Sequence, residues 1–255
     1  MSASADDVSR SGFAYRFAWG VDGLLALAPI CDVIVVIDVL RFTSAVSVAV
    51  DAGATVFPFR WKDDRAASYA AERHAQLAGL RENGGPSLSP TDMIRLPPST
   101  RIVLPSPNGS TISLTAAEHG VPFVLAGSLR NATATARRAL ALSRDGAIGV
   151  IAAGERWDDA SGPLRPALED LLGAGAVLAA LDPSAAVAGP RCSPEAAVAR
   201  SAFVDATSSL TETLVSCVSG SELVARGWLD DVETSARLDV SLRAAQLVDD
   251  AFVAA

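Results

Sequence analysis

The chain has 255 residues, half of them hydrophobic, and a formal net charge of −8. This length and composition fit one domain with a large buried core and exclude disordered, collagen-like and disulfide-stapled chains. The negative charge argues against binding to nucleic acid, and the lack of a signal peptide or of an apolar segment that could cross a bilayer predicts a cytoplasmic protein without a membrane partner.

From residue 33 onward, short runs rich in β-branched residues alternate with longer runs of helical periodicity. Residues 33–37 are five β-branched residues in a row, which is typical of a strand buried on both faces of a parallel sheet. Further strands are expected at residues 54–59, 101–104, 122–126 and 147–152. Helices are expected at residues 43–51, 63–80, 110–119, 131–143 and 166–181. This alternation predicts an α/β protein, a three-layer α/β/α sandwich with a largely parallel sheet.

The remaining parts of the chain are set off by two breaks rich in Gly, Pro and Ser, at residues 81–98 and 182–194. We expect residues 193–255 to form a mostly helical C-terminal part packed on the sheet, and residues 1–12 to be frayed. The whole chain, 1–255, is therefore interpreted as a single domain. Its sequence leaves open whether two copies form a homodimer.

Several enzyme classes lack the residues that they need. None of the three cysteines is followed six residues later by an arginine, which excludes phosphatases with a cysteine nucleophile. Two histidines are too few for a zinc or binuclear site built on several of them. Asp38 follows an apolar strand, as does the nucleophile of haloacid-dehalogenase-type phosphatases, but Leu40 stands where those enzymes need a second aspartate. The absence of a G-x-G-x-x-G motif disfavours a Rossmann oxidoreductase.

The turn after the expected strand 33–37 carries an acid, a guanidinium and two hydroxyls: Asp38, Arg41, Thr43 and Ser44. In open α/β sheets, ligands bind at the carboxyl ends of strands, and helix N-termini attract phosphate. The turn therefore predicts an anion-binding site. The alternative is structural, with Thr43 or Ser44 capping the helix and Arg41 in a surface ion pair.

Two further turns between a strand and a helix have a similar composition. One contains Asn108, Gly109 and Ser110, and the other contains Ser128 and Asn131. Turns of this kind can point consecutive backbone N–H groups at an oxyanion. Either turn alone is better explained as a turn followed by a helix cap, but their recurrence after successive strands favours a shared site.

A fourth group of polar residues follows the expected strand 147–152. It consists of Glu155, Arg156, Arg165, Glu169 and Asp170. Mg²⁺ prefers hard oxygen ligands, so Asp38 with Glu169 or Asp170 could hold this ion. The alternative is that the two acids at residues 169 and 170 only interact with the dipole of their helix.

At these residues the chain resembles the 2-phosphosulfolactate phosphatase family of coenzyme M biosynthesis, a Mg²⁺-dependent group. The likeness covers roughly residues 30–240 and rests on the order and spacing of many short motifs. The matching motifs are residues 37–41 with Thr43 and Ser44, Ser89-Pro90, Asn108-Gly109, Gly127-Ser128 with Asn131, Ala153-Gly154, Glu169-Asp170 with Gly173-Ala174, Ser219-Gly220, Leu223, Gly227 and Asp230-Asp231. The chain departs from the family at Phe42, at Glu155 and Arg156, and in a shortened loop before residue 89.

The resemblance implies a Mg²⁺-dependent phosphomonoester hydrolase that converts a small multi-anionic ester, 2-phosphosulfolactate, to 3-sulfolactate and phosphate. On this interpretation Asp38, Arg41 and Ser44 are catalytic, and the metal ligands are Asp38, Glu169 and Asp170. Whether Asp38 is a metal ligand or a covalent nucleophile stays open. The residues expected to bind the substrate are Thr43, Asn108, Gly109, Ser110, Ser128, Asn131, Arg156 and Arg165.

Two other functions also stay open. The first is a non-catalytic anion-binding or regulatory module on the same fold, because Phe42, Glu155 and Arg156 add bulk to the expected site. The second is a nucleotide-using transferase, which a nucleotide would stabilise thermally. Release of phosphate from a phosphomonoester, with and without Mg²⁺, distinguishes the hydrolase from the binding module.

Overall fold

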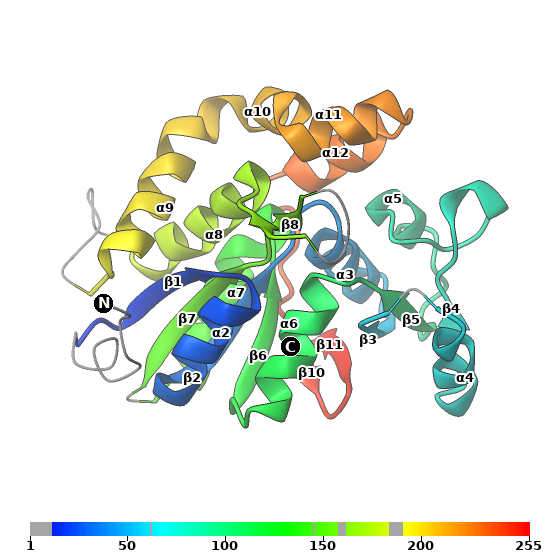
Figure 1. The fold of residues 1–255 in the computed structure, drawn as a ribbon, viewed down its shortest axis with the longest axis horizontal. Coiled ribbons are helices and arrows are strands. Elements are labelled where there is room, and N and C mark those ends of the chain that lie inside the picture. The colour runs from blue at the N-terminus through cyan, green and yellow to red at the C-terminus, as the bar shows by residue number, and fades with distance from the viewer. Residues whose placement is uncertain (1–11, 62, 145, 158–161, 184–190) are drawn as a thin grey trace.

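The structure is a computed structural model that describes residues 12–61, 63–144, 146–157, 162–183 and 191–255 (Figure 1). Residues 1–11 of the segment expected to be frayed lie outside the described residues.

One large sheet runs through the described part of the chain, in the strand order β1-β7-β2-β6-β10-β11-β3-β5-β4. A first parallel group consists of β1 (Tyr15–Trp19), β7 (Ala147–Ala152), β2 (Cys31–Ile37) and β6 (Phe123–Gly127). A second parallel group consists of β3 (Thr55–Phe59), β5 (Arg101–Pro105) and β4 (Gln76–Leu77). The antiparallel hairpin of β10 (Ala245–Val248) and β11 (Ala251–Ala254) lies between the two groups. The expected largely parallel sheet is confirmed.

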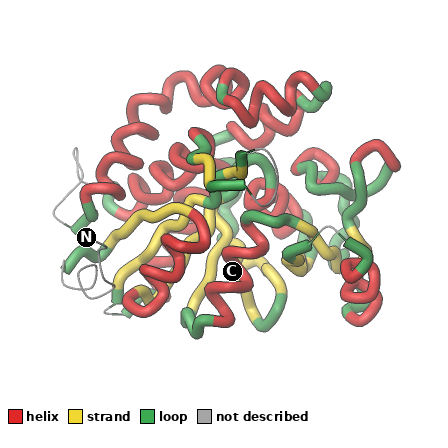
Figure 2. The backbone as a smooth tube through the Cα atoms, viewed as in Figure 1, coloured by secondary structure: helices red, strands yellow, loops and turns green. Residues whose placement is uncertain are grey.

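The sheet is covered by helices on both faces (Figure 2). The helices that pack on β2 are α7 (Ala132–Leu142) and α8 (Leu168–Leu181) on one face, and α2 (Gly20–Leu27) and α6 (Gly109–Glu118) on the other. Successive side chains of a strand point to opposite faces. Val33, Val35 and Ile37 therefore join the core with α7 and α8, whereas Ile34 and Val36 join the core with α2 and α6. All five side chains are fully buried, and the three-layer arrangement is confirmed.

The C-terminal part is mostly helical, as expected. Its helices are α9 (Pro194–Ala206), α10 (Leu210–Ser216), α11 (Val218–Ala225) and α12 (Leu229–Ala236), which form an arch beside α8 in Figure 1. Gly175 lets α9 approach α8, because a Cβ atom there would lie 2.2 Å from the carbonyl oxygen of Ala199. In the described part of the chain, no helix is both long and apolar enough to cross a membrane.

The expected helix at residues 63–80 is wrong in its second half. Helix α4 spans only Arg65–Glu72, and the chain then turns through His74, whose φ of 48° lies in the left-handed region, into β4. A left-handed residue cannot continue a right-handed helix. Within the expected loop 81–98, a short helix α5 (Pro90–Met93) begins after Ser89, whose side chain accepts a hydrogen bond from the N–H of Asp92.

The strands β10 and β11 lie at the end of the segment 193–255, which the sequence predicts to be mostly helical. Their two-residue turn, residues 249–250, is Asp-Asp, with Asp249 at a φ of 55°. The usual signal for such a turn is a glycine after Asn or Asp. Because that signal is missing here, the hairpin cannot be recognised from its turn.

Candidate active site

The carboxylate of Asp38 lies at the carboxyl end of β2 and is held by the starts of two helices. Its Oδ1 accepts a hydrogen bond from the N–H of Phe42 at 3.2 Å, at the start of α3 (Phe42–Asp51). Its Oδ2 accepts hydrogen bonds from the N–H of Gly109 at 2.8 Å and from Ser106 Oγ at 3.3 Å. The turn after β5 and the turn after β2 therefore meet at this side chain.

Gly109 is required for this contact. A Cβ atom on Gly109 would lie 2.3 Å from the ring of Phe42 and 2.7 Å from Asp38 Oδ2. Real Cβ atoms do not approach other atoms so closely, so any larger residue would displace the carboxylate. The Asn-Gly pair thus serves first to bring a backbone N–H to Asp38.

Asp170, in the first turn of α8, holds two other strand ends together. Its Oδ1 accepts a hydrogen bond from the N–H of Val39 at 2.7 Å, and its Oδ2 accepts one from the N–H of Gly154 at 2.8 Å. Val39 follows β2 and Gly154 follows β7, which are neighbours in the sheet. The side chain is buried, with both carboxylate oxygens bound to the main chain.

Two further carboxylates complete an acidic cluster, defined here as Asp38, Glu155, Glu169 and Asp170. Glu155 Oε2 accepts a hydrogen bond from the amide of Asn108 at 3.0 Å, and Glu169 Oε2 accepts one from the thiol of Cys217 at 3.3 Å. Glu169 is 2% exposed. The cluster thus gathers acids from the ends of β2 and β7 and from the start of α8.

Burial and mutual repulsion raise the pKa values of three acids of this cluster, Asp38, Glu155 and Asp170. Burial raises the pKa of Asp38, against the opposing effect of its hydrogen-bond donors. Burial, followed by the charges of Glu169 and Asp38, raises the pKa of Asp170 well above its usual range. Burial and then the charge of Asp38 raise the pKa of Glu155 to about 7, and the buried Arg165 opposes this rise only weakly. Such a site favours a proton or a cation.

The type of these side chains fits a magnesium ion, but their arrangement is not a complete cage. Among the described residues, no three His, Cys, Asp or Glu side chains are placed to hold one metal ion together. Mg²⁺ commonly takes only one or two protein carboxylates, and waters and substrate phosphate complete its shell. The oxygen donors of the cluster are compatible with that mode of binding.

The hydroxyl groups of the Asp38 turn are engaged with its own main chain. Thr43 Oγ1 accepts a hydrogen bond from the N–H of Asp38 at 3.0 Å and lies 2.9 Å from its carbonyl oxygen. Ser44 Oγ donates to the carbonyl of Val39 at 2.7 Å, and Ser110 Oγ donates to the carbonyl of Leu104 at 3.2 Å. All three hydroxyl-bearing residues are fully buried, so in this structure they shape the turns.

Ser128 and Asn131 lie at the same edge of the sheet but make contacts within their own turn. Asn131 Oδ1 accepts hydrogen bonds from the N–H and the hydroxyl of Ser128 at 2.9 and 3.0 Å. Gly127, the preceding residue, pairs with Ile37 in the sheet, which places this turn beside that of Asp38. No hydrogen bond joins the two turns within the described part of the chain.

The three arginines predicted at the site lie in different surroundings. Arg41 forms an ion pair with the fully buried Asp231 at 2.7 Å. Arg165 is buried and donates to Ser219 Oγ at 3.3 Å. Arg156 is exposed and donates to the carbonyl of Gly162 at 3.2 Å, on the small hairpin of β8 (Glu155–Arg156) and β9 (Leu164–Arg165).

Four residues around the site were not identified from the sequence as site residues. Ser106 donates to Asp38, while Asp231, Arg81 and Trp228 surround Arg41. Ser106 directly follows β5 and directly precedes the Pro-Asn-Gly turn, so its position in the sequence could have identified it as a site residue. The others come from distant segments, and only the fold brings them to Arg41.

Comparison with known proteins gives one result at the level of a family. A search of curated protein sequences returns no match. The sequence profile of a family described as 2-phosphosulpholactate phosphatase matches residues 24–248. This match spans nearly the whole chain, including all four acids of the cluster and the turns that hold them. The chain therefore belongs to the 2-phosphosulpholactate phosphatase family, a family of phosphoric monoester hydrolases.

Proposed function

We propose that this protein hydrolyses 2-phosphosulfolactate to 3-sulfolactate and phosphate at the acidic cluster, with Mg²⁺ as cofactor. The observation that carries the proposal is the position of Asp38, fixed by two backbone N–H groups at the starts of α3 and α6 beside three other acids. The family match supports the substrate. The substrate is a small, multiply anionic phosphate ester.

Asp38 and Glu169 are the proposed metal ligands, and Asp170 completes the expected set of three. When bound, Mg²⁺ would neutralise charge on the phosphoryl oxygens and lower the pKa of a bound water. Asp170 already binds two backbone N–H groups, so its larger contribution is to hold the ends of β2 and β7 together. Burial raises the pKa values of Asp38 and Asp170, and a bound cation would favour their charged forms.

The protein's own groups would orient the ester and carry the proton. The N-terminal end of α6 lies at the cluster, and the positive end of its dipole would attract the phosphoryl oxygens. Asn108 and Gly109, at this end of the helix, already donate to Glu155 and Asp38 and so hold these two acids in place. Water adds to phosphorus, the ester P–O bond breaks, and a proton must pass from the water to the leaving oxygen. Glu155, with a pKa of about 7, can hold that proton near neutral pH.

The proposal is tested by phosphate release from 2-phosphosulfolactate, measured with Mg²⁺ and with a chelator. We expect chelation to abolish turnover, and Asp38→Asn to lower kcat by at least about 10²-fold, as when one charge-stabilising group is removed. Asn has the size of Asp, so circular dichroism should show an unchanged fold. The matched control is Asp249→Asn, at an exposed turn residue with a left-handed backbone that Asn tolerates.

Near wild-type activity of Asp38→Asn, or turnover that is indifferent to the chelator, would contradict the proposal. Phosphate binding without turnover of any ester would favour the non-catalytic module. One observation argues against the non-catalytic module, which the bulk of Phe42 helped to motivate. Phe42 is fully buried and packs edge-on against Phe252, with 6.1 Å between ring centres. The Phe42 ring therefore fills the hydrophobic core.

A further inference from the structure

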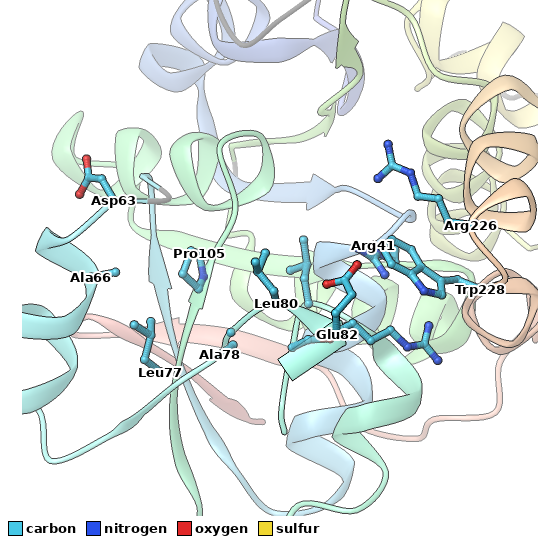
Figure 3. A pocket seen from close by; sticks show the side chains of 14 residues that line it. Arg41, Asp63, Ala66, Leu77, Ala78, Leu80, Glu82, Pro105, Arg226 and Trp228 are labelled. Carbon is cyan, nitrogen blue, oxygen red and sulfur yellow. The ribbon is translucent and has the colours of Figure 1, made fainter. Parts of the chain in front are cut away.

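A cavity of about 380 Å³ adjoins the turn that carries Asp38 (Figure 3). Arg41, three residues after Asp38, lines it, and so does Pro105, which directly precedes the Ser106 that donates to Asp38. The wall next to Arg41 comes from the segment between α11 and α12, with Arg226 and Trp228 (Figure 3). The cavity is thus continuous with the turn of the acidic cluster but lies outside the cluster itself.

Three guanidinium groups surround one indole ring in this cavity. Arg41 lies 4.7 Å, Arg81 5.7 Å and Arg226 5.6 Å from the centre of the Trp228 ring. The faces of aromatic rings attract cations, which allows like charges to gather here. Two carboxylates, Asp63 and Glu82, also line the cavity.

The three arginines differ in their partners. Arg41 and Arg81 both bind Asp231, at 2.7 and 2.9 Å, and Arg81 also binds Asp230 at 2.8 Å. Arg226 is exposed, and within the described part of the chain its guanidinium contacts the indole but has no carboxylate or hydrogen-bond partner. Arg226 therefore keeps its donors available to a ligand.

We propose that this cavity binds the sulfonate of the substrate, one of its two anionic groups besides the phosphate, and that Arg226 is the residue that selects it. The inference rests on the proposed function, because the phosphoryl group must lie at the acidic cluster. A three-carbon acid places its further anions only a few bonds from the phosphate, and the turn that carries Asp38 also carries Arg41, which lies 4.7 Å from the centre of the Trp228 ring in the cavity. A guanidinium donates several hydrogen bonds in one plane, which suits the oxygens of a sulfonate.

The test compares two esters that differ only in the sulfonate, 2-phosphosulfolactate and 2-phospholactate, at fixed ionic strength. We expect wild type to prefer the sulfonated ester. Arg226→Gln should lower kcat/KM for that ester by about 10 to 100-fold, mainly through KM, as for loss of a charged hydrogen bond. The loss for 2-phospholactate should be much smaller. The matched control is Arg137→Gln on α7, an exposed arginine outside the cavity, which should behave as wild type.

Several outcomes would overturn the inference. One is a wild-type enzyme without preference for the sulfonated ester, and another is an equal loss for both esters in Arg226→Gln. A third is selectivity that falls in Arg156→Ala but persists in Arg226→Gln, which would place the sulfonate at the exposed hairpin of β8 and β9.

The failure of the proposed function is a separate result. If wild type turns over neither ester, calorimetric titration with 3-sulfolactate decides the inference alone. Weaker binding by Arg226→Gln than by wild type and Arg137→Gln supports the sulfonate site. Equal affinity of the three proteins, or no binding to any of them, overturns it.

Discussion

Glu155 shows how a single residue takes its chemistry from its surroundings. As a surface side chain it would be an ordinary acid with a pKa near 4.5, but burial and then the charge of Asp38 raise the pKa to about 7, although the hydrogen bond from Asn108 lowers it. At the level of sequence it stood out as part of the polar group after the expected strand 147–152 and as a departure from the family, without an assigned role. The structure makes it an acid whose protonation changes near neutral pH.

This raised pKa predicts the direction in which stability changes with pH. Between about pH 4.5 and 7 the native metal-free protein binds a proton at Glu155 that the unfolded chain has lost, so the free energy of unfolding falls as the pH rises. The contribution is fully present below pH 4.5 and is lost above about pH 7. Its size is roughly 1–3 kcal/mol.

The measurement is urea unfolding in chelator at several pH values, for wild type and Glu155→Gln. The variant should show a flatter dependence across this window, because Gln does not titrate. Asp38 and Asp170 titrate in both proteins, so the difference isolates Glu155. Parallel curves for the two proteins would contradict the assignment.

Part of the candidate site could be predicted from the sequence, because some of its residues directly follow strands and parallel strands end at the same edge of a sheet. Asp38 and Gly109 follow strands directly, and the structure brings them into hydrogen-bond contact. For Thr43 and Ser44 the sequence could not predict the role of the side chain. A hydroxyl at the start of a helix can bind either the main chain or a ligand, and the sequence pattern is the same in both cases. The environment of Arg41 depends on α12, which is about 190 residues away in sequence.

At the scale of elements, α12 is joined to the Asp38 turn through one buried side chain. Asp231 accepts hydrogen bonds from Arg41 at 2.7 Å, from Arg81 at 2.9 Å and from Thr91 at 2.9 Å, and it also accepts one from Ser89. Three separate segments thus converge on a carboxylate that is fully buried. The walls of the arginine-lined cavity depend on this connection.

We expect Asp231→Asn to cost about 3–5 kcal/mol in the free energy of unfolding, because it leaves two guanidiniums without their buried counter-charge. The adjacent Asp230→Asn is the matched control. Asp230 is half exposed and pairs with Arg81 at 2.8 Å, so its loss should cost about 1 kcal/mol or less. Urea unfolding of the two variants measures the difference, and equal effects would show that Asp231 does not join these segments.

The elements themselves were predictable where periodicity was strong. The strands near residues 33–37, 101–104 and 147–152 and the helices α3, α6, α7 and α8 lie close to their expected places. The helix predicted at residues 63–80 failed because helical spacing continued past His74, where the backbone turns left-handed. Residues 76–77 form a strand because they pair with β5, and a pairing between distant segments cannot be predicted from the local sequence.

On the scale of the whole molecule, the sheet consists of two parallel groups joined by the hairpin of β10 and β11. Phe252 on β11 pairs with Val56 of β3 and packs against Phe42 beside the candidate site. The parallel groups followed from the alternation of β and α segments. Their connection did not, because the hairpin pairs with strands more than one hundred residues earlier in the chain.

Phe252→Ala should therefore destabilise the molecule by about 3–5 kcal/mol, the cost of removing a buried aromatic side chain. Val253→Ala, in the same strand but only partly buried, is the matched control and should cost much less. Denaturant unfolding followed by tryptophan fluorescence and circular dichroism gives both values. A small effect of Phe252→Ala would mean that the two groups of strands hold together without the hairpin.

The order of these strands along the chain determines which strand edges are unpaired while the protein is being synthesised. The ribosome makes β6 and β3 well before β10 and β11, which later come to lie between them. Until then both strands present unpaired N–H and C=O groups along one edge, to which strands of other nascent chains can add. Nascent chains that stall short of residue 245 are thus the species in which this protein is most exposed to aggregation.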